Sequence, residues 1–303
     1  METHVVTGAF SYTGRYLTRR LLAQGIKVKT LTNHPHRPNP FGDQVSVAPF
    51  HFGKPEELAE SLRGATVLYN TYWVRFAHGT TTYDEAVENT KTLIRAADAA
   101  GVSRLVHVSI ANADAHSRLP YYRGKGQLEQ FIRESKLSYA IVGPTVIYST
   151  EDILINNIAW FVRRFPVFGV PGKGEYGIQP IFVEDMAEIM ADAGSRADNM
   201  SIDAVGPEVF TFDELVRLIA RKINRRTAIW HMPPGLALLA SQLIGLMVGD
   251  VVLTREEVDG LMAGLLVSKK PPTGKTRLTE WLSENADKVG SQYHSELGRH
   301  FGR

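Results

Sequence analysis

The sequence predicts an α/β fold in which helices cover both faces of a parallel sheet. Three observations lead to this prediction. Short apolar segments of strand length alternate with amphipathic segments of helical period, a glycine-marked turn follows the first strand, and four further strand–helix units come after it. Connected strand–helix–strand units form parallel sheets with right-handed crossovers. Ligands of such sheets bind at the carboxyl ends of the strands.

The N-terminal elements follow one another at the spacing of these units. Strands are expected over residues 4–7, 26–32, 44–48, 66–71, 104–109 and 138–142, and helices over 13–23, 55–63, 83–100 and 121–135. Gly25 ends the first helix, as a C-cap glycine does. The order is that of a Rossmann-type, doubly wound sheet, and we expect residues 1–150 to form this dinucleotide-binding domain.

After Pro144 the pattern becomes that of a smaller, mostly helical region. Helices are expected over residues 151–164, 211–222, 235–247, 254–265 and 276–287, and one strand over 178–183 leads into a helix near Asp185. We expect residues 151–303 to form mainly a substrate-binding region. Residues 176–215 are expected to return in part to the Rossmann sheet.

Composition excludes several classes of function. The 34 Lys and Arg nearly balance the 32 Asp and Glu, so no overall field attracts nucleic acid. The absence of cysteine excludes disulfides and thiolate sites, and the ten histidines form no ligand set with carboxylates, so no metal is expected. The apolar run over 236–248 is shorter than the about 20 residues of a membrane-spanning helix.

The chain enters its first strand almost at once, which leaves no room for a signal peptide, and a cytoplasmic protein is expected. A homodimer and a peripheral association with a membrane both remain open as modes of assembly.

The turn after the first strand carries the first chemical motif, TGAFSYTG over residues 7–14. Backbone N–H groups at a helix N-terminus bind pyrophosphate, and glycines leave room for its approach. Gly8 and Gly14 have the outer spacing of G-x-x-G-x-x-G, and Ser11 takes the middle place. Its hydroxyl either bonds a phosphate or weakens binding by its bulk. The alternative is a tight turn with no ligand. The predicted dinucleotide contacts in this turn are Gly8, Phe10, Ser11, Tyr12, Thr13 and Gly14.

The end of the second strand indicates which dinucleotide is bound. NAD-binding proteins usually place Asp or Glu there for the ribose 2′-OH, whereas NADP-binding proteins supply cations for the 2′-phosphate. The segment over 31–37 contains no acid, and Asn33 and Arg37 lie within it. Arg15, directly after Gly14, is a further candidate cation. We predict a preference for NADP, with NAD as the alternative if these cations are only surface groups.

The second motif is Tyr121-x-x-x-Lys125. Residues four apart share one face of a helix, so the phenol and the ammonium are expected side by side. Lys125 would lower the pKa of the phenol and hold a ribose hydroxyl, while Tyr121 would pass a proton to the substrate oxygen. Among eleven tyrosines, only Tyr121 has a lysine four residues on. The alternative is a surface pair that contributes a few tenths of a kcal/mol.

Aromatic residues over 69–76 follow the fourth strand, on the ligand side of the predicted sheet. They are expected either to pack in the core or to form one wall of a pocket for nicotinamide and an apolar small-molecule substrate. The predicted substrate contacts are Tyr72 and Trp73 on this wall and Tyr148, Asn156 and Gln179 on the other.

Five further segments accompany these motifs: ENTKTL at 88–93, VHVS at 106–109, GPTVIY at 143–148, EDIL at 151–154 and QPIFVED at 179–185. In combination they resemble the extended and atypical branch of the short-chain dehydrogenase/reductase family, which is NAD-dependent epimerase/dehydratase-like. Within this branch the chain is similar to the group around the nucleotide-binding accessory subunit of respiratory complex I and to NmrA-like proteins. The resemblance runs from about His4 to Asp185 and more loosely to Thr211.

The resemblance implies further site residues. Cofactor contacts are implied at Asn70 and Thr71 and near Ser109. They are also implied along a third segment, at Pro144, Thr145 and Val146. The family's Ser or Thr that polarises the substrate carbonyl would fall where Ala111 and Asn112 stand. Ser109 or Asn112 would replace it, since either can hydrogen-bond a carbonyl oxygen. Residues 50–52, FHF, stand where the family usually has an Asp near adenine.

The sequence therefore predicts an NAD(P)-dependent oxidoreductase or epimerase that moves a hydride between nicotinamide and a carbonyl or alcohol carbon. One alternative is a non-catalytic NAD(P)-binding redox sensor or assembly factor, because relatives in this branch often keep the lysine without catalysis. Another is an accessory factor of a lipid or quinone pathway, which the apolar segment 235–248 suggests.

Overall fold

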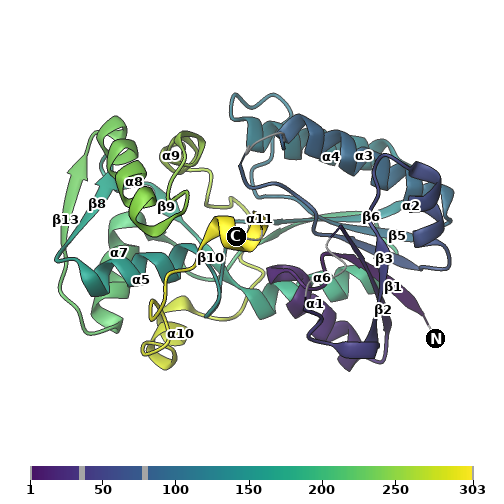
Figure 1. Ribbon diagram of the computed structural model, residues 1–303, viewed down its shortest axis with the longest axis horizontal. Coiled ribbons are helices and arrows are strands. Elements are labelled where there is room, and N and C mark those ends of the chain that lie inside the picture. The colour runs from purple at the N-terminus through teal and green to yellow at the C-terminus, as the bar shows by residue number, and fades with distance from the viewer. Residues whose placement is uncertain (1, 34–37, 77–80, 302–303) are drawn as a thin grey trace. The chain divides into compact units, whose positions relative to one another are not determined.

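The computed structural model describes residues 2–33, 38–76 and 81–301, and these divide into two compact units (Figure 1). Unit 1 comprises Met1–Pro144 and Val183–Ala204, and unit 2 comprises Thr145–Phe182 and Val205–Arg303. The chain therefore leaves unit 1 after its sixth strand and returns to it for one helix and one strand.

Unit 1 is built on a seven-stranded sheet in the order β11-β6-β5-β4-β1-β2-β3. Its strands are β1 (Thr3–Thr7), β2 (Lys27–Thr32), β3 (Val45–Pro49), β4 (Val67–Asn70), β5 (Arg104–Val108), β6 (Ser138–Pro144) and β11 (Met200–Ala204). Every pairing within this sheet is parallel. The strand order reverses between β1 and β4, so the predicted doubly wound Rossmann-type sheet is confirmed, and its switch point lies between these two strands.

Helices cover both faces of this sheet (Figure 1). On one face α1 (Tyr12–Ala23) packs against α6 (Val183–Ser195), and on the other α2 (Pro55–Leu62), α3 (Tyr83–Ala99) and α4 (Pro120–Glu134) pack in sequence. A short 3₁₀ helix, η1 (Gly42–Gln44), precedes β3. Local signals explain the helix starts. The Thr82 side chain accepts a bond from the Glu85 N–H at the start of α3, and α2 and α4 begin at prolines.

One buried arginine joins the returning segment to the sheet. Arg104, on β5, donates from Nε to the Ala193 carbonyl on α6 (2.6 Å) and from a terminal nitrogen to the Asp198 carbonyl (3.0 Å). Its other terminal nitrogen donates to the Ser138 hydroxyl (2.5 Å). A partial return to the sheet was expected within residues 176–215, but no strand was expected at the residues of β11. Its five residues alternate poorly, and they become a strand because they pair with the buried β6.

Unit 2 is mostly helical. Its helices are α5 (Leu154–Arg164), α7 (Phe212–Lys222), α8 (Pro234–Val248), α9 (Arg255–Met262), α10 (Leu278–Glu284) and α11 (Glu296–Phe301). Three two-stranded sheets accompany them: β7 (Val146–Tyr148) with β10 (Pro180–Phe182), β9 (Gly177–Ile178) with β12 (Phe210–Thr211), and β8 (Val167–Pro171) with β13 (Ala228–Met232). Its core joins apolar faces of α5, α7 and α10. The smaller, mostly helical region expected from the sequence is confirmed.

Two elements of unit 2 differ from the expectation. The helix expected from residue 151 begins at Leu154, with Ile153 as its N-cap residue, and the buried Asp152 before it accepts a bond from the Ile155 N–H (2.7 Å). The strand expected over 178–183 is two short strands, β9 and β10, which pair with different partners. Among the described residues, none of the helices has the length and apolar character to cross a membrane.

Candidate functional site

The turn between β1 and α1 is fixed by bonds to β2. Gly8 has a φ of +71°, which favours glycine, and its N–H donates to the Leu31 carbonyl (3.2 Å). The Ala9 N–H donates to the Thr30 hydroxyl (3.0 Å), which itself donates to the Val6 carbonyl (3.0 Å). The turn is therefore held in one conformation at the carboxyl edge of the sheet, next to the switch point.

Ser11 folds its hydroxyl back onto this turn. Both its N–H and its hydroxyl donate to the Gly8 carbonyl, at 2.8 Å and 2.6 Å. Ser11 is the N-cap residue of α1, yet its side chain makes no capping bond to the helix. The sequence left open whether the Ser11 hydroxyl bonds a phosphate or weakens its binding. A bond to a phosphate would require the hydroxyl to leave the Gly8 carbonyl.

Gly14 is needed for the packing of the turn itself. A Cβ atom at this position would lie 2.2 Å from the Gly8 carbonyl oxygen and 2.9 Å from the Gly8 carbonyl carbon. These are backbone atoms, so the neighbour cannot turn aside as a side chain can. Gly14 therefore lets α1 start close against the end of β1, whatever ligand the turn holds.

The N-terminus of α1 is suited to an anion. Its first turn contains Tyr12, Thr13 and Gly14 and no acidic residue, whereas α2 and α3 carry two acids each in their first turns. The N–H groups of a first helical turn and the helix dipole favour a phosphate at such an end. Phe10, in the same turn, lies beside Phe41 with the ring centroids 6.4 Å apart.

The side where adenine is expected is only partly described. Asn33 is exposed at the end of β2, and Arg37 lies outside the described residues. After β3, Phe50 packs with Phe52 and with Tyr72, at centroid distances of 4.3 Å and 5.4 Å. The Tyr72 hydroxyl accepts a bond from the Asn89 amide (3.2 Å). Tyr72 thus packs in this aromatic cluster.

A buried polar network joins the ends of three neighbouring strands. The Thr7 hydroxyl donates to the side-chain oxygen Oδ1 of Asn70 (3.1 Å) and accepts the N–H groups of Thr71 (2.8 Å) and Tyr72 (3.1 Å). The Thr71 hydroxyl donates to the Thr7 carbonyl. The Asn70 amide nitrogen lies 3.0 Å from Nδ1 of His107 on β5. The side chains of Asn70 and Thr71, both predicted as cofactor contacts, are therefore bonded across the sheet.

Lys125 is buried at the end of β5. Its ammonium donates to the Val108 carbonyl (2.7 Å) and lies 4.3 Å from the centroid of the Trp73 ring, and the residue is 2% exposed. Burial lowers the pKa of Lys125 to about 7, which Glu129, four residues on, partly opposes. Burial and the nearby Lys125 charge hold the pKa of His107 well below its usual value.

Tyr121 and Lys125 meet the same aromatic ring. Trp73 lies edge-to-face with Tyr121 (5.8 Å between centroids) and stacks on Tyr83 (6.2 Å). Gly124 leaves room for this ring, since a Cβ there would lie 3.0 Å from it. The Trp73 indole nitrogen is buried and has no hydrogen-bond partner among the described residues. Tyr121 and Lys125 thus share a face of α4, and Trp73 covers the lysine on that face.

Ser109 and Asn112 have different surroundings. The buried Ser109 hydroxyl donates to the Glu129 carboxylate (2.5 Å), which also accepts a bond from Arg133 (2.8 Å). Asn112 has a φ of +59° in the turn after β5. Sequence reasoning missed Glu129 and His107. The i,i+4 series Lys125, Glu129, Arg133 on one helix was the available signal for the former.

The site residues predicted in unit 2 form hydrogen bonds or strand pairs with other residues of the same unit. Tyr148 is fully buried and its hydroxyl donates to the Thr276 carbonyl (3.1 Å). The Gln179 amide donates to the Gly206 carbonyl (2.9 Å) and accepts the Ser268 N–H (3.0 Å). The Thr145 hydroxyl donates to the Gln179 carbonyl, and Val146 begins β7, where it pairs with Pro180.

Both the nitrogen and the oxygen of the Asn156 side-chain amide form hydrogen bonds within unit 2. Its nitrogen donates to Asp152 (2.8 Å) and to the Ser149 carbonyl (3.0 Å), and its oxygen accepts the Gly290 N–H (3.2 Å). In unit 1, the Pro144 carbonyl accepts the Ala111 N–H (2.8 Å) at the end of β6. For Tyr148, Asn156 and Gln179 these bonds are structural, and substrate contact remains a prediction.

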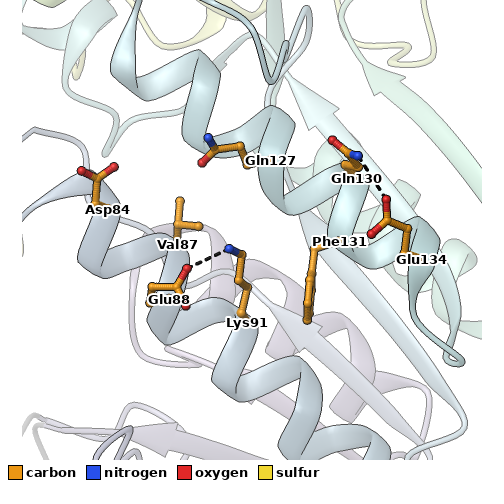
Figure 2. A pocket seen from close by; sticks show the side chains of 8 residues that line it. All are labelled: Asp84, Val87, Glu88, Lys91, Gln127, Gln130, Phe131 and Glu134. Carbon is orange, nitrogen blue, oxygen red and sulfur yellow. Dashed lines mark hydrogen bonds and ion pairs between the residues drawn. The ribbon is translucent and has the colours of Figure 1, made fainter.

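A groove between α3 and α4 holds none of the predicted site residues (Figure 2). Its polar side chains bond one another: Lys91 pairs with Glu88 (2.7 Å), and Gln130 donates to Glu134 (3.1 Å). The lining residues are Asp84, Val87, Glu88, Lys91, Gln127, Gln130, Phe131 and Glu134. The described residues contain no group of three or more His, Asp or Glu side chains placed to hold a metal ion.

Comparison with known proteins identifies an NAD(P)H-binding domain in the chain. The NAD(P)H-binding family matches residues 8–157. Subunit 9 of the NADH dehydrogenase [ubiquinone] 1 alpha subcomplex, mitochondrial, from Arabidopsis thaliana is 24% identical over 283 residues, which cover 87% of this chain and 70% of that protein. The 40 kDa subunit of NADH-ubiquinone oxidoreductase from Neurospora crassa is 24% identical over 77% of this chain and 63% of its own length. A photosystem II assembly factor of Cyanophora paradoxa is 28% identical over 45% of this chain and 43% of its own length.

Solved structures share the fold. A triphenylmethane reductase of Citrobacter sp. superposes with a TM-score of 0.77 at 16% identity, covering 94% of this chain and 99% of that one. An NADPH-dependent quinone oxidoreductase of Escherichia coli, solved with NADPH, gives a TM-score of 0.76 at 20% identity, covering 93% and 99%. At these identities the likeness extends to the fold alone.

The packing role of Gly14 can be tested without a ligand. We expect Gly14→Ala to lower the free energy of unfolding by roughly 3 kcal/mol, since the methyl group would press on the Gly8 carbonyl. Urea unfolding of the ligand-free protein measures this. Gly53→Ala is the control, because no atom lies within 4 Å of a Cβ there. If Gly14→Ala unfolds like the wild type and loses only dinucleotide affinity, the glycine serves the ligand and not the turn.

The buried charge of Lys125 predicts a pH dependence of stability. The lysine pKa is about 7 in the folded chain and about 10.4 when unfolded, so the unfolded state binds more protons between these values. The free energy of unfolding of the wild type therefore rises with pH above 7, as the buried lysine loses its charge. Below pH 7 the lysine is charged, and the full destabilisation from its burial is present. We expect the advantage of Lys125→Met over wild type to shrink by up to about 1.4 kcal/mol per pH unit between pH 7 and 9.

Urea unfolding at pH 7, 8 and 9 measures this difference. Lys136→Met, at an exposed position, serves as the control and should show no such trend. A constant difference between Lys125→Met and wild type over this range would contradict a lowered pKa at Lys125.

Proposed function

Because the chain is an extended short-chain dehydrogenase/reductase-like protein with an NAD(P)H-binding domain, we propose that it is an oxidoreductase acting on an apolar small molecule. The reaction is hydride transfer between nicotinamide and a carbonyl or alcohol carbon. The observation that carries the proposal is the position of Tyr121 and Lys125. They share one face of α4, beside the carboxyl end of β5 and in contact with Trp73.

The residues of the turn fit a dinucleotide. The α1 N-terminus has no competing acid, and Gly8 and Gly14 keep the backbone close to the end of β1. When bound, the dinucleotide supplies or accepts the hydride. The α1 N–H groups would hold its pyrophosphate, and Lys125 would exchange its bond to Val108 for one to the nicotinamide ribose.

Tyr121 would then act as the acid and base. A phenol beside an ammonium loses its proton more readily, because the positive charge stabilises the phenolate. Tyr121 would donate its proton to the substrate oxygen in reduction and recover it in oxidation. Lys125 is only 2% exposed, so contact with a ribose requires Trp73 to move from its place over the ammonium. Trp73 would then line the substrate side of the site.

A second function is favoured by the position of Trp73 over Lys125 and by the similar proteins named above. Lys125 bonded to Val108 beneath Trp73 is an arrangement that requires no catalytic role, and the similar proteins include complex I subunits and a photosystem assembly factor. In this alternative the chain binds NAD(P) as a structural ligand or redox sensor within an assembly. Turnover distinguishes the two functions.

For the cofactor we propose NADP, with NAD as the alternative. No acid follows β2 as far as residue 37, and Arg15 follows Gly14 on α1. We expect NADPH to bind more tightly than NADH by at least one charge-assisted hydrogen bond, roughly 1.5–3 kcal/mol. Calorimetry with both dinucleotides measures the difference. Arg15→Gln should reduce it, and the control Arg19→Gln, at an exposed residue, should not. Tighter binding of NADH by the wild type would overturn the proposal.

Tyr121 and Lys125 separate catalysis from binding. Tyr121→Phe removes only the hydroxyl, so we expect dinucleotide affinity to stay nearly constant and turnover to fall by about 10²–10⁴, the usual contribution of a positioned acid–base group. Lys125→Met should reduce both. A screen of aldehydes, ketones and quinones with NADPH and NADH supplies the assay, and Tyr139→Phe is the matched control. A wild type that binds dinucleotide without any turnover, and whose binding falls in Lys125→Met, would support the structural or sensor function instead.

A further inference from the structure

Helix α8 presents its large side chains outward. It buries small residues, Ala237, Ser241 and Gly245, against the rest of unit 2. Gly245 is needed where the helix ends, since a Cβ there would lie 2.5 Å from the carbonyl oxygen of Asp250 in the following turn. A helix that served only the core would bury its leucines and expose its small residues. The reversed arrangement indicates that the apolar face has a use outside the fold.

The exposed face of α8 is a continuous apolar stripe. Its members are Leu236, Leu239, Leu243, Leu246 and Met247, which are 41%, 54%, 59%, 83% and 80% exposed. At 100° per residue they fall within about 100° of the helix circumference. The fifteen residues of α8 include no charged side chain, and the helix is about 22 Å long. Apolar patches of this kind on a protein surface mark interaction sites.

The β8–β13 ribbon adjoins this helix, because α8 packs against β8 and begins two residues after β13 ends. Trp230 is 57% exposed and Val167 48% exposed. In the parallel register Trp230 pairs with Gly169 and Ala228 with Val167, so these residues point to one side of the ribbon. A tryptophan at the border of an apolar surface is typical of membrane interfaces, where the ring lies among lipid headgroups.

Arginine pairs precede both strands of the ribbon. Arg163 and Arg164 end α5 before β8, and Arg225 and Arg226 come shortly before β13. Burial lowers the pKa of Arg163, and the neighbouring positive charges of Arg225 and Arg164 lower it further. Arg163 donates to the carbonyls of Val289 and Ala286, and Arg164 donates to the Trp160 carbonyl. Arg225 and Arg226 are exposed, so they are the charges best placed to meet an anionic partner.

We propose that the α8 stripe and the exposed side of the β8–β13 ribbon bind the surface of a membrane that contains anionic lipids. The helix would lie in the plane of the interface, with its leucines among the upper acyl chains and the arginines near the phosphates. A protein partner is the less favoured occupant, since the stripe offers no hydrogen-bonding group besides Gln242 that would specify one. The proposal is independent of the hydride-transfer function.

Vesicle flotation of the full chain tests the proposal. The probes are vesicles of phosphatidylcholine alone and of phosphatidylcholine with 30% phosphatidylglycerol. We expect the wild type to float with the anionic vesicles, and the double variant Leu243→Glu, Leu246→Glu to bind at least about tenfold more weakly. The double variant Arg225→Gln, Arg226→Gln should lose about tenfold on anionic vesicles and show no difference on neutral ones. Val209→Glu is the matched control, at an apolar residue 53% exposed on another part of unit 2.

Circular dichroism and dinucleotide affinity verify that each variant is folded. Equal flotation of the wild type and the Leu243, Leu246 variant would overturn the proposal, and so would flotation that ignores the lipid charge. Sedimentation velocity gives a further outcome. A wild-type dimer that becomes a monomer in the leucine variant, with no flotation of either, would assign the stripe to a second copy of the chain and would also overturn the proposal.

Discussion

The contact between Gly14 and the Gly8 carbonyl is the constraint on which the rest of unit 1 depends. It sets α1 directly against the end of β1, and so places the helix N-terminus at the switch point of the sheet. The bonds from Gly8 to Leu31 and from Ala9 to Thr30 tie the same turn to β2. A side chain at Gly14 would tilt the helix and remove the N–H groups from the edge where an anion can reach them.

A second constraint in unit 1 is the burial of a charged side chain, that of Lys125. Lys125 sits almost without solvent contact, held by one carbonyl and an aromatic face, and this burial lowers its pKa to about 7. Such an arrangement costs stability in the absence of a ligand. A ribose hydroxyl would replace the Val108 carbonyl as the acceptor, so the same burial that destabilises the free protein favours the bound one. In the proposed function, Trp73 is the residue that would have to move for this exchange.

Unit 2 shows how an even charge balance conceals local organisation. The whole chain carries a formal charge of only +2, which gave no reason to expect binding to anionic membranes. The fold gathers Arg163, Arg164, Arg225 and Arg226 at the start of one ribbon and turns the leucines of α8 outward. Net charge is a sum over the whole chain, whereas binding to a surface depends on how charged and apolar side chains are grouped in space.

The sequence by itself determined the Rossmann-type sheet, its helices, the position of the glycine-marked turn after β1 and the place of Tyr121 and Lys125 on one face of α4. All of these follow from periods and spacings of a few residues, which backbone geometry fixes locally. Only the tertiary structure decided that the Ser11 hydroxyl bonds Gly8, that Trp73 covers Lys125, and that Asn156 is held by Gly290. Trp73 and Lys125 are 52 positions apart in the sequence, and Asn156 and Gly290 are 134 positions apart. No local pattern reports such pairings, because a side chain's direction is set by whatever distant segment packs against it.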